Sequence, residues 1–206
     1  MLPPIFFIVV GCLGLYTIFN KRADKYFITS QERWPYGVLF IGTLLIGAGS
    51  AYYHLNPNNA MLLWDRLPIG MITRAYFSAI FMEQVNCRIG LLLLGPLVVL
   101  GLLATIQWKI SESLEHGDLR LYVWAQFYPI SMMIIILLLF PSPYSGIYYL
   151  IESLGWYGIA KIAEFFDYGI YQLTGHLVSG HTLKHLAAAL ALYAVIRYLT
   201  HRKIKH

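Results

Sequence analysis

"IGLLLLGPLVVLGLLATIQ", residues 89–107, contains no charged side chain. A helix needs about 20 predominantly apolar residues to cross the hydrocarbon core of a bilayer, so this stretch predicts a membrane-spanning helix. The composition of the chain agrees, because 58% of its 206 residues are hydrophobic and 12% are charged, whereas a soluble domain carries about 25% charged residues. The chain is therefore predicted to be an integral membrane protein.

Six further segments have a similar length and apolar character, and polar or turn-forming residues separate them. These segments are residues 3–19, 35–54, 60–81, 121–140, 146–166 and 179–199. The first is interpreted as a retained helix rather than a signal peptide, because its basic residues follow the apolar run. The sequence thus predicts an all-α membrane protein in which residues 1–206 form one domain. This domain is a seven-transmembrane helix bundle whose consecutive helices are antiparallel neighbours.

The basic residues outside these segments indicate how the bundle is oriented. If seven helices alternate in direction, one face has chiefly Lys109 and Arg120, and the other face has most of the basic loop and tail residues. Those residues are Lys21, Arg22, Lys25, Arg33, Arg88, Arg202, Lys203 and Lys205. Because cytoplasmic loops are rich in lysine and arginine, the N-terminus is predicted outside and the C-terminus in the cytoplasm. The same residues account for the net charge of +5, so no nucleic-acid partner is expected.

Three places in these apolar segments hold polar residues. "SAYYH", residues 50–54, ends the second segment, Asp65 lies near the start of the third, and "HTLKH", residues 181–185, begins the seventh. In the predicted topology all three meet at the non-cytoplasmic face, at one depth in the membrane. Polar groups at membrane depth are costly and mark functional sites, so these residues are candidates for one site.

The residue types at these places predict a metal centre. His181 and His185 are four residues apart, share one helix face and can bind one metal ion. His54 from a facing helix would complete the three-ligand set of a catalytic zinc site, whose fourth position is open to water. Asp65 is placed to accept a proton without being a ligand. Ser50, one turn from His54, can donate a hydrogen bond to a developing oxyanion.

The same residues also have structural interpretations. A single intramembrane histidine is commonly a hydrogen-bonded bundle residue, and Asp65 could cap its helix or pair with Arg66. Asn58 or Asn59 is the better cap, and adjacent helix residues do not face each other. Ser50 has the stronger alternative, because serine among glycines is typical of close helix packing, so both of its interpretations remain open. The glycines are Gly42, Gly47 and Gly49.

In order and spacing, "SAYYH", "DRLP" and "HTLKH" resemble the motifs of the alkaline ceramidases, within the CREST superfamily of seven-transmembrane hydrolases. The resemblance implies one zinc ion per chain, held by His54, His181 and His185. It implies Asp65 as the general acid and base and Ser50 as the oxyanion stabiliser. The implied reaction is hydrolysis of the amide bond of ceramide or a related acyl lipid, which releases a fatty acid and a sphingoid base.

Two departures from the family pattern lead to further expectations. Many members have Asp-Glu before Leu-Pro, whereas this chain has Asp65 and Arg66, so its headgroup preference is expected to differ. Animal members carry an acidic segment before the first helix that binds calcium. Here the first helix is expected to begin at once, with "MLPP", so no calcium site of that type is predicted.

Other functions of seven-helix proteins are alternatives to lipid hydrolysis. Receptors of the progestin and adiponectin type share the polar signature but insert in the opposite sense. A retinal-binding protein needs a lysine deep in the seventh segment, whereas Lys184 lies in its first turns. A haem-binding protein is the remaining alternative.

The predicted partners are the lipid substrate and the surrounding membrane lipids, and the oligomeric state is left open. The chain is predicted to be a multi-pass protein of a bacterial inner membrane or an endomembrane, with its site toward the non-cytoplasmic face.

In the sixth segment, Lys161 and Glu164 are predicted to form an ion pair, since residues three apart are neighbours on a helix.

Overall fold

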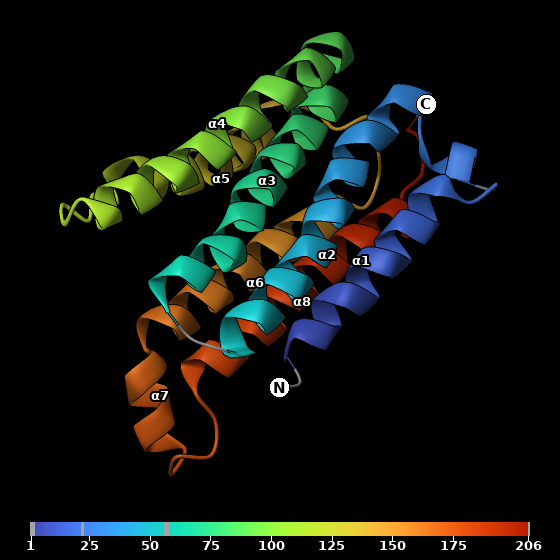
Figure 1. Ribbon diagram of the computed structural model, residues 1–206. Coiled ribbons are helices and arrows are strands. Elements are labelled where there is room, and N and C mark those ends of the chain that lie inside the picture. Colours follow the sequence, from blue (N-terminus) through green and yellow to red (C-terminus); the bar gives the residue numbers. More distant parts are fainter. Residues whose placement is uncertain (1–2, 22, 56–57, 206) are drawn as a thin grey trace.

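The computed structural model describes residues 3–21, 23–55 and 58–205, which form helices joined by loops. The helices are α1 (Pro3–Phe19), η1 (Ala23–Tyr26), η2 (Ser30–Glu32), α2 (Arg33–Leu55), α3 (Asn59–Gln84), α4 (Cys87–Ser113), α5 (Arg120–Leu139), α6 (Tyr148–Phe165), α7 (Asp167–Leu173) and α8 (Gly180–His201) (Figure 1). The predicted all-α class is confirmed. Arg22 of the predicted basic face and Met1–Leu2, at the predicted start of the first helix, lie outside the described residues.

The helices are of the membrane type. Among the described residues, four helical segments are long and apolar enough to cross a bilayer, namely Ser30–Leu55, Cys87–Ser113, Arg120–Leu139 and Gly180–His201. Their outer faces carry large apolar side chains, and Leu92, Leu138 and Leu139 are each more than 70% exposed. A soluble protein rarely exposes apolar patches of this kind, whereas lipid chains surround them at no cost.

The other three long helices coincide with predicted segments but differ in length or polarity. The helix α1 is apolar and comprises 17 residues. The helices α3 and α6 contain charged side chains along their length, among them Asp65 and Arg74 in α3 and Glu164 in α6. These side chains lower the apolar character of α3 and α6, because each one replaces an apolar residue within the span.

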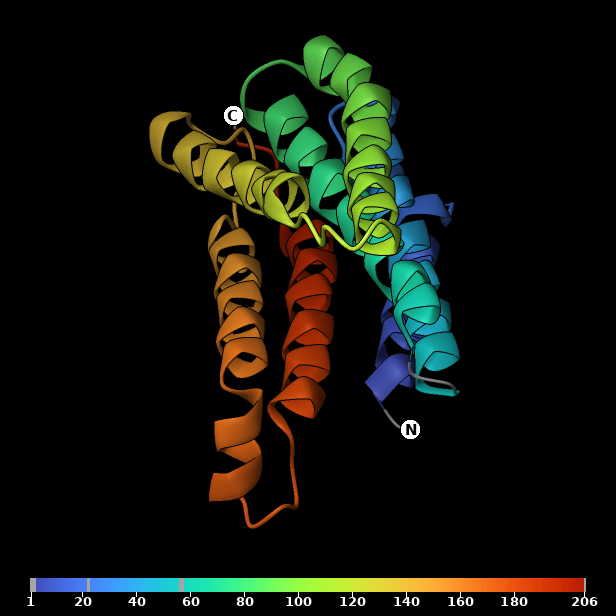
Figure 2. The same cartoon turned by 60° about the vertical axis from the view of Figure 1, so that its left-hand side comes forward.

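The order of packing brings the first and the last long helices side by side. Each of α1 to α4 packs on the next, α6 packs along α8, and α8 also packs on α1. The helix α5 packs on α3 and α4 rather than along α6, so the prediction of antiparallel neighbours throughout is wrong at this connection. Figures 1 and 2 show the hairpin of α4 and α5 running obliquely to α6 and α8.

A short helix lies within the segment that was predicted to be the sixth loop. The helix α7 begins at Asp167, and an acidic residue in the first turn is favourable at the positive end of the helix dipole. It ends before Gly175 and His176, which both have positive φ angles of 63° and 68°. Glycine adopts this left-handed conformation easily, and it commonly terminates helices.

The end of the bundle with the C-terminal tail holds a buried ionic cluster, which corrects the prediction that Arg202 is a loop-face charge. The Arg202 side chain is fully buried and forms an ion pair with Glu83. Its Nη2 atom also lies 3.8 Å from the Oε2 atom of Glu32, and its Nε–H donates to the backbone carbonyl oxygen of Tyr26 at 2.7 Å. Burial raises the pKa of Tyr144 above its ordinary value, so its hydroxyl stays protonated and donates to Glu32.

The helices α2 and α3 touch through their backbones at Gly49. A Cβ atom at this position would lie 2.2 Å from the carbonyl oxygen of Trp64. We expect Gly49→Ala to force α2 and α3 apart and to lower the free energy of unfolding by about 1 to 3 kcal/mol, as overpacking does. Thermal unfolding in detergent micelles measures the effect. Gly155→Ala in α6 is the control, because nothing lies within 4 Å of its Cβ position; equal stability of both variants would contradict the prediction.

Candidate metal centre

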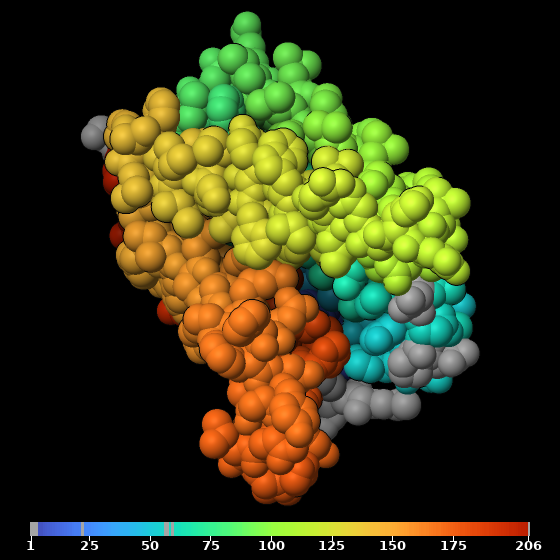
Figure 3. Space-filling view, turned by 90° about the vertical axis from the view of Figure 1, so that its left-hand side faces the viewer, coloured from blue at the N-terminus to red at the C-terminus, as the bar shows by residue number. Residues whose placement is uncertain are grey.

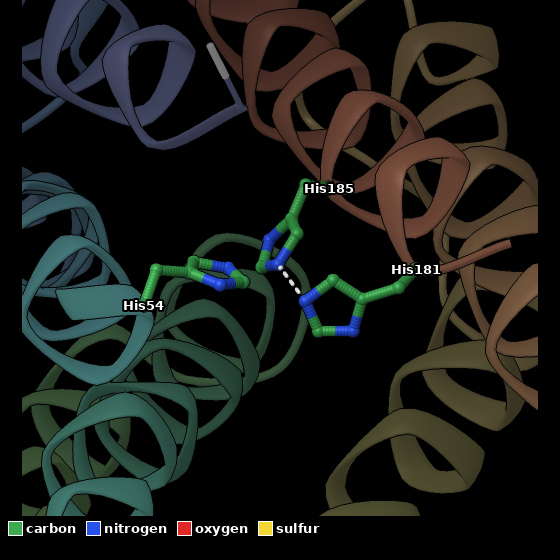
Figure 4. Close-up of side chains that lie close together, drawn as sticks. All are labelled: His54, His181 and His185. Carbon is green, nitrogen blue, oxygen red and sulfur yellow. Dashed lines mark hydrogen bonds between the residues drawn. The ribbon is translucent and has the colours of Figure 1, made fainter. Parts of the chain in front are cut away.

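Three histidines meet where α2 ends and α8 begins. His54 lies in the last turn of α2, and His181 and His185 lie in the first turns of α8. One ligand atom from each lies within 4.8 Å of those of the other two, and Figure 4 shows the three rings pointing toward one another. The Nε2 atoms of His181 and His185 are 2.9 Å apart. The structure therefore brings the three predicted ligands together.

The first turn of α8 is held in place by polar contacts and close packing. The Ser179 hydroxyl accepts a hydrogen bond from the Thr182 amide at 3.2 Å, and Asp167 accepts one from the His181 amide at 2.7 Å. A Cβ atom at Gly180 would lie 2.2 Å from the carbonyl oxygen of Ala163, so α8 begins in direct contact with the end of α6. These contacts hold the backbone of His181, and the helical repeat then places His185 on the same face.

The donor set fits a zinc ion. Imidazole nitrogen is a preferred zinc ligand, and tetrahedral Zn–N bonds of about 2.0 to 2.1 Å hold two ligand nitrogens about 3.3 Å apart. The 2.9 Å between the Nε2 atoms of His181 and His185 needs only a small adjustment to reach this separation. His185 is 4% exposed, and the Phe7 ring packs against it with an angle of 81° between the two ring planes. His54 and His181 are only half-buried, so the centre is closed on one side and accessible on the other.

Asp65 and Ser50 complete the predicted constellation. Asp65 is 7% exposed and Ser50 is fully buried. Ser50, Lys184 and His54 lie close enough to the Asp65 carboxylate to stabilise its negative charge. Asp65 does not belong to the group of potential ligand atoms found among the described residues. It therefore lies near the histidines, with two of which it lines adjoining spaces, but outside the group of three candidate ligands.

The alternative interpretations of Asp65 and Ser50 have different outcomes. The side chain of Asn58 accepts hydrogen bonds from the amides of Ala60 and Met61 at 3.0 and 2.9 Å, so Asn58 caps α3 and Asp65 does not. The packing interpretation of Ser50 is supported by Gly49, where α2 touches α3. The Ser50 hydroxyl lies close to the Asp65 carboxylate, but within the described part of the chain it has no hydrogen-bond partner of normal geometry.

An ion network borders the centre on the side of α6. Lys161 donates to Glu164 at 2.7 Å, which confirms the predicted pair. Lys184 donates to the other oxygen of Glu164 at 3.1 Å, a contact that no pattern in the sequence indicates. Helical periodicity places Lys184 away from the face shared by His181 and His185, but it does not reveal which helix lies opposite. The side chain of Lys184 reaches α6 and thereby ties α8 to it.

Two spaces adjoin the centre. An apolar cavity of about 120 Å³ lies between the helices and is bordered by Asp65, His185 and Tyr76. A more open groove of about 750 Å³ is lined by Asp65 and His181 and by residues of α3, α5 and α6. Figure 3 shows the face on which α5 (yellow), α6 (orange) and the start of α3 (cyan) surround a hollow. Asp65 lines both spaces, so a molecule in either can contact the candidate site.

Among the described residues, three further histidines lie away from the centre. His116, His176 and His201 are exposed and lie in loops or at a helix end. Comparison of the chain with known protein families, with curated proteins and with solved structures finds no match. The resemblance drawn from the three sequence motifs therefore stays a prediction.

Proposed function

We propose that this protein is a zinc-dependent intramembrane lipid hydrolase that cleaves the amide bond of ceramide or a related acyl lipid, as the resemblance to the alkaline ceramidases implies. The observation that carries the proposal is the convergence of three histidines from α2 and α8 with Asp65, a buried carboxylate that is not a ligand. A structural histidine cluster needs no such carboxylate beside it, whereas hydrolysis needs a group that transfers protons.

Each residue of the constellation has a distinct task in this proposal. A zinc ion held by His54, His181 and His185 would supply Lewis-acid activation of water and of a carbonyl group. The Asp65 carboxylate accepts a proton from the attacking water and then gives it to the departing amine. The Ser50 hydroxyl, which has no partner of normal geometry among the described residues, donates to the carbonyl oxygen as negative charge develops on it.

The surroundings of the constellation suit a lipid substrate. The cavity beside Asp65 has mainly apolar walls, which include Ile72, Ile130 and Leu192. Such walls accept an acyl chain and keep bulk water away from the reacting bond. The scissile bond of an amphipathic lipid lies near its headgroup. The depth of this bond matches a site that is one or two turns from the end of α2 and from the start of α8.

We further propose that all seven long helices cross the membrane, with the N-terminus and the metal centre toward the non-cytoplasmic side of a bacterial inner membrane or an endomembrane. The support is the distribution of basic residues, because cytoplasmic loops are rich in lysine and arginine. Lys109 and Arg120 flank the connection between α4 and α5. The other basic residues of the loops and the tail lie between α1 and α2, at the starts of α2 and α4, or in the tail, and Figure 1 shows these segments at the end of the bundle opposite the start of α8. Those that the structure describes are Lys21, Lys25, Arg33, Arg88, Arg202, Lys203 and Lys205.

Replacement of Asp65 tests the proposed chemistry. We expect purified Asp65→Asn to retain zinc but to release fatty acid from lipids about 10² to 10⁴ times more slowly than wild type, because general acid–base catalysis contributes a factor of this size. A panel of amide-linked and ester-linked acyl lipids is incubated with each protein, and free fatty acid is measured by mass spectrometry. Asp24→Asn is the matched control, because the Asp24 side chain is 84% exposed. Equal release by wild type and Asp65→Asn would exclude this mechanism.

A further inference from the structure

Arg66 occupies an unusual setting beside the candidate metal centre. It follows Asp65 on α3, and its guanidinium carbon lies 4.1 Å from the ring centroid of Trp108 in α4 and 5.3 Å from that of Tyr122 in α5. Stacking on aromatic rings fixes the plane of a guanidinium group without using its N–H donors. The described residues include no carboxylate in an ion pair with Arg66, and its Nη1 atom is buried without a hydrogen-bond partner.

The other arginine of α3 shows how a buried guanidinium is ordinarily satisfied. Arg74 donates to the carbonyl oxygen of Gly70 at 2.7 Å and to that of Ala125. A buried donor without a partner is costly, and the cost is greater for a charged group. Arg66 therefore differs from Arg74 in that it lies against two aromatic rings and has a charged donor without a partner among the described residues.

Arg66 is one of the residues that line the groove with Asp65 and His181, so its guanidinium group lies next to any molecule that enters the groove. The other charged groups of the groove are Lys161, Lys184 and Glu164, and Glu164 already pairs with both lysines. Three cations therefore face two carboxylates, and the groove is positive even without a metal ion. An anion that enters the groove is attracted by this net positive charge, and Arg66 supplies a donor that has no partner among the described residues.

We propose that Arg66 binds an anionic oxygen group, such as a phosphate ester, on the headgroup of the lipid that occupies this groove. This inference rests on the proposed function for the identity of the lipid but not for the anion site. The planar fork of a guanidinium group matches the oxygens of phosphate. A lipid rather than a free anion is favoured because apolar side chains, among them Ile69, Phe127 and Ile162, line the same groove.

Binding measured apart from turnover tests the proposal. All proteins carry Asp65→Asn to slow hydrolysis, and they are purified as full chains and loaded with zinc. Each is incubated with phosphatidylcholine vesicles that contain either an N-acyl sphingoid base or its 1-phosphate ester, and native mass spectrometry measures the lipid retained. With Arg66 present, we expect the phosphorylated lipid to be retained about tenfold better than the neutral one. Arg66→Gln is expected to remove this preference and Arg66→Lys to keep part of it.

Controls separate the anion site from the fold and from net charge. Arg88→Gln removes the same charge from an exposed residue at the start of α4 and is expected to keep the preference. Undiminished binding of the neutral lipid by Arg66→Gln shows that this variant is folded. The proposal is overturned if Arg66→Gln keeps the full preference. It is also overturned if inorganic phosphate alone binds through Arg66 while the phosphorylated lipid is not preferred.

Hydrolysis is measured in parallel with Asp65 intact, so that the two proposals fail separately. An Arg66-dependent preference without hydrolysis of any lipid would support the anion site and exclude the proposed function. Hydrolysis of the neutral lipid without any preference would support the proposed function and overturn the anion site.

Discussion

Simultaneous replacement of His181 and His185 by alanine is expected to reduce the zinc content of the purified protein from about one ion per chain to nearly none, because one histidine is left of the three ligands that a catalytic zinc site needs. The two residues project from adjacent turns of α8 and have Nε2 atoms 2.9 Å apart, so they form the core of the proposed centre. Lipid hydrolysis is expected to fall to background with the loss of zinc. Elemental analysis by mass spectrometry gives the metal content of wild type and variant.

The control variant is His176→Ala with His201→Ala, which removes the same number of histidines from exposed positions. It is expected to retain zinc and activity. A ligand that binds only the folded state also raises its stability, so a chelator should lower the unfolding temperature of wild type and of the control variant, but not that of His181→Ala with His185→Ala. Zinc retained by the double variant, or absent from wild type supplied with zinc, would rule out this centre.

Much of this arrangement could be predicted because two simple periodicities determine it. Successive residues of a helix are about 100° apart around its axis, and this rotation places His181 and His185 on one face. Alternating helix directions place the end of the second long helix beside the starts of the third and the last, which brings in His54 and Asp65. The prediction needed no knowledge of which helices touch. It required only that the polar residues lie at the same depth and that polar groups in a membrane seek partners.

The features that could not be predicted depend on contacts between distant segments. Lys184 pairs with Glu164 because α6 packs along α8, and no local pattern reveals that neighbour. The helix α5 lies on α3 and α4, where Arg74 donates to the carbonyl oxygen of Ala125, and this contact also joins segments that are distant in the sequence. A basic residue that follows the last apolar segment is typical of a solvated loop or tail. Arg202 is instead buried, because carboxylates from two other segments contact it.

The cluster around Arg202 joins segments that lie far apart in the sequence. Its guanidinium contacts Glu83 at the end of α3 and lies 3.9 Å from the ring centroid of Tyr144, in the connection between α5 and α6. The hydroxyls of Tyr36 and Tyr198 each donate to Glu83 at 2.8 Å. The tail then continues beside the same connection, where the Ser145 amide donates to the carbonyl oxygen of Lys203 and the Lys205 amide to that of Pro143. One side chain therefore holds the ends of several helices and the tail together.

Arg202→Met is accordingly expected to lower the free energy of unfolding by about 3 to 5 kcal/mol, because it leaves buried carboxylates without their cation. The side chains of Arg202 and Glu83 are both fully buried, so water cannot replace the lost contact. The matched control is Arg197→Met, also on α8, whose ion pair with Glu152 at 2.7 Å is 38% and 33% exposed. This exposed pair is expected to contribute about 0 to 1 kcal/mol. Denaturant titration in detergent micelles measures both variants.

A double-mutant cycle distinguishes loss of the ion pair from loss of packing. Glu83→Gln removes the buried negative charge and keeps an acceptor oxygen for one of the two tyrosine hydroxyls, while its amide nitrogen can donate to the other. Its combination with Arg202→Met therefore leaves fewer unpaired charges than Arg202→Met alone. The double variant is therefore expected to lose less stability than the sum of the two single losses, with a coupling of about 0.5 to 3 kcal/mol. Additive losses, or an Arg202→Met variant as stable as Arg197→Met, would show that the charges are not coupled and that Arg202 acts through its apolar stem alone.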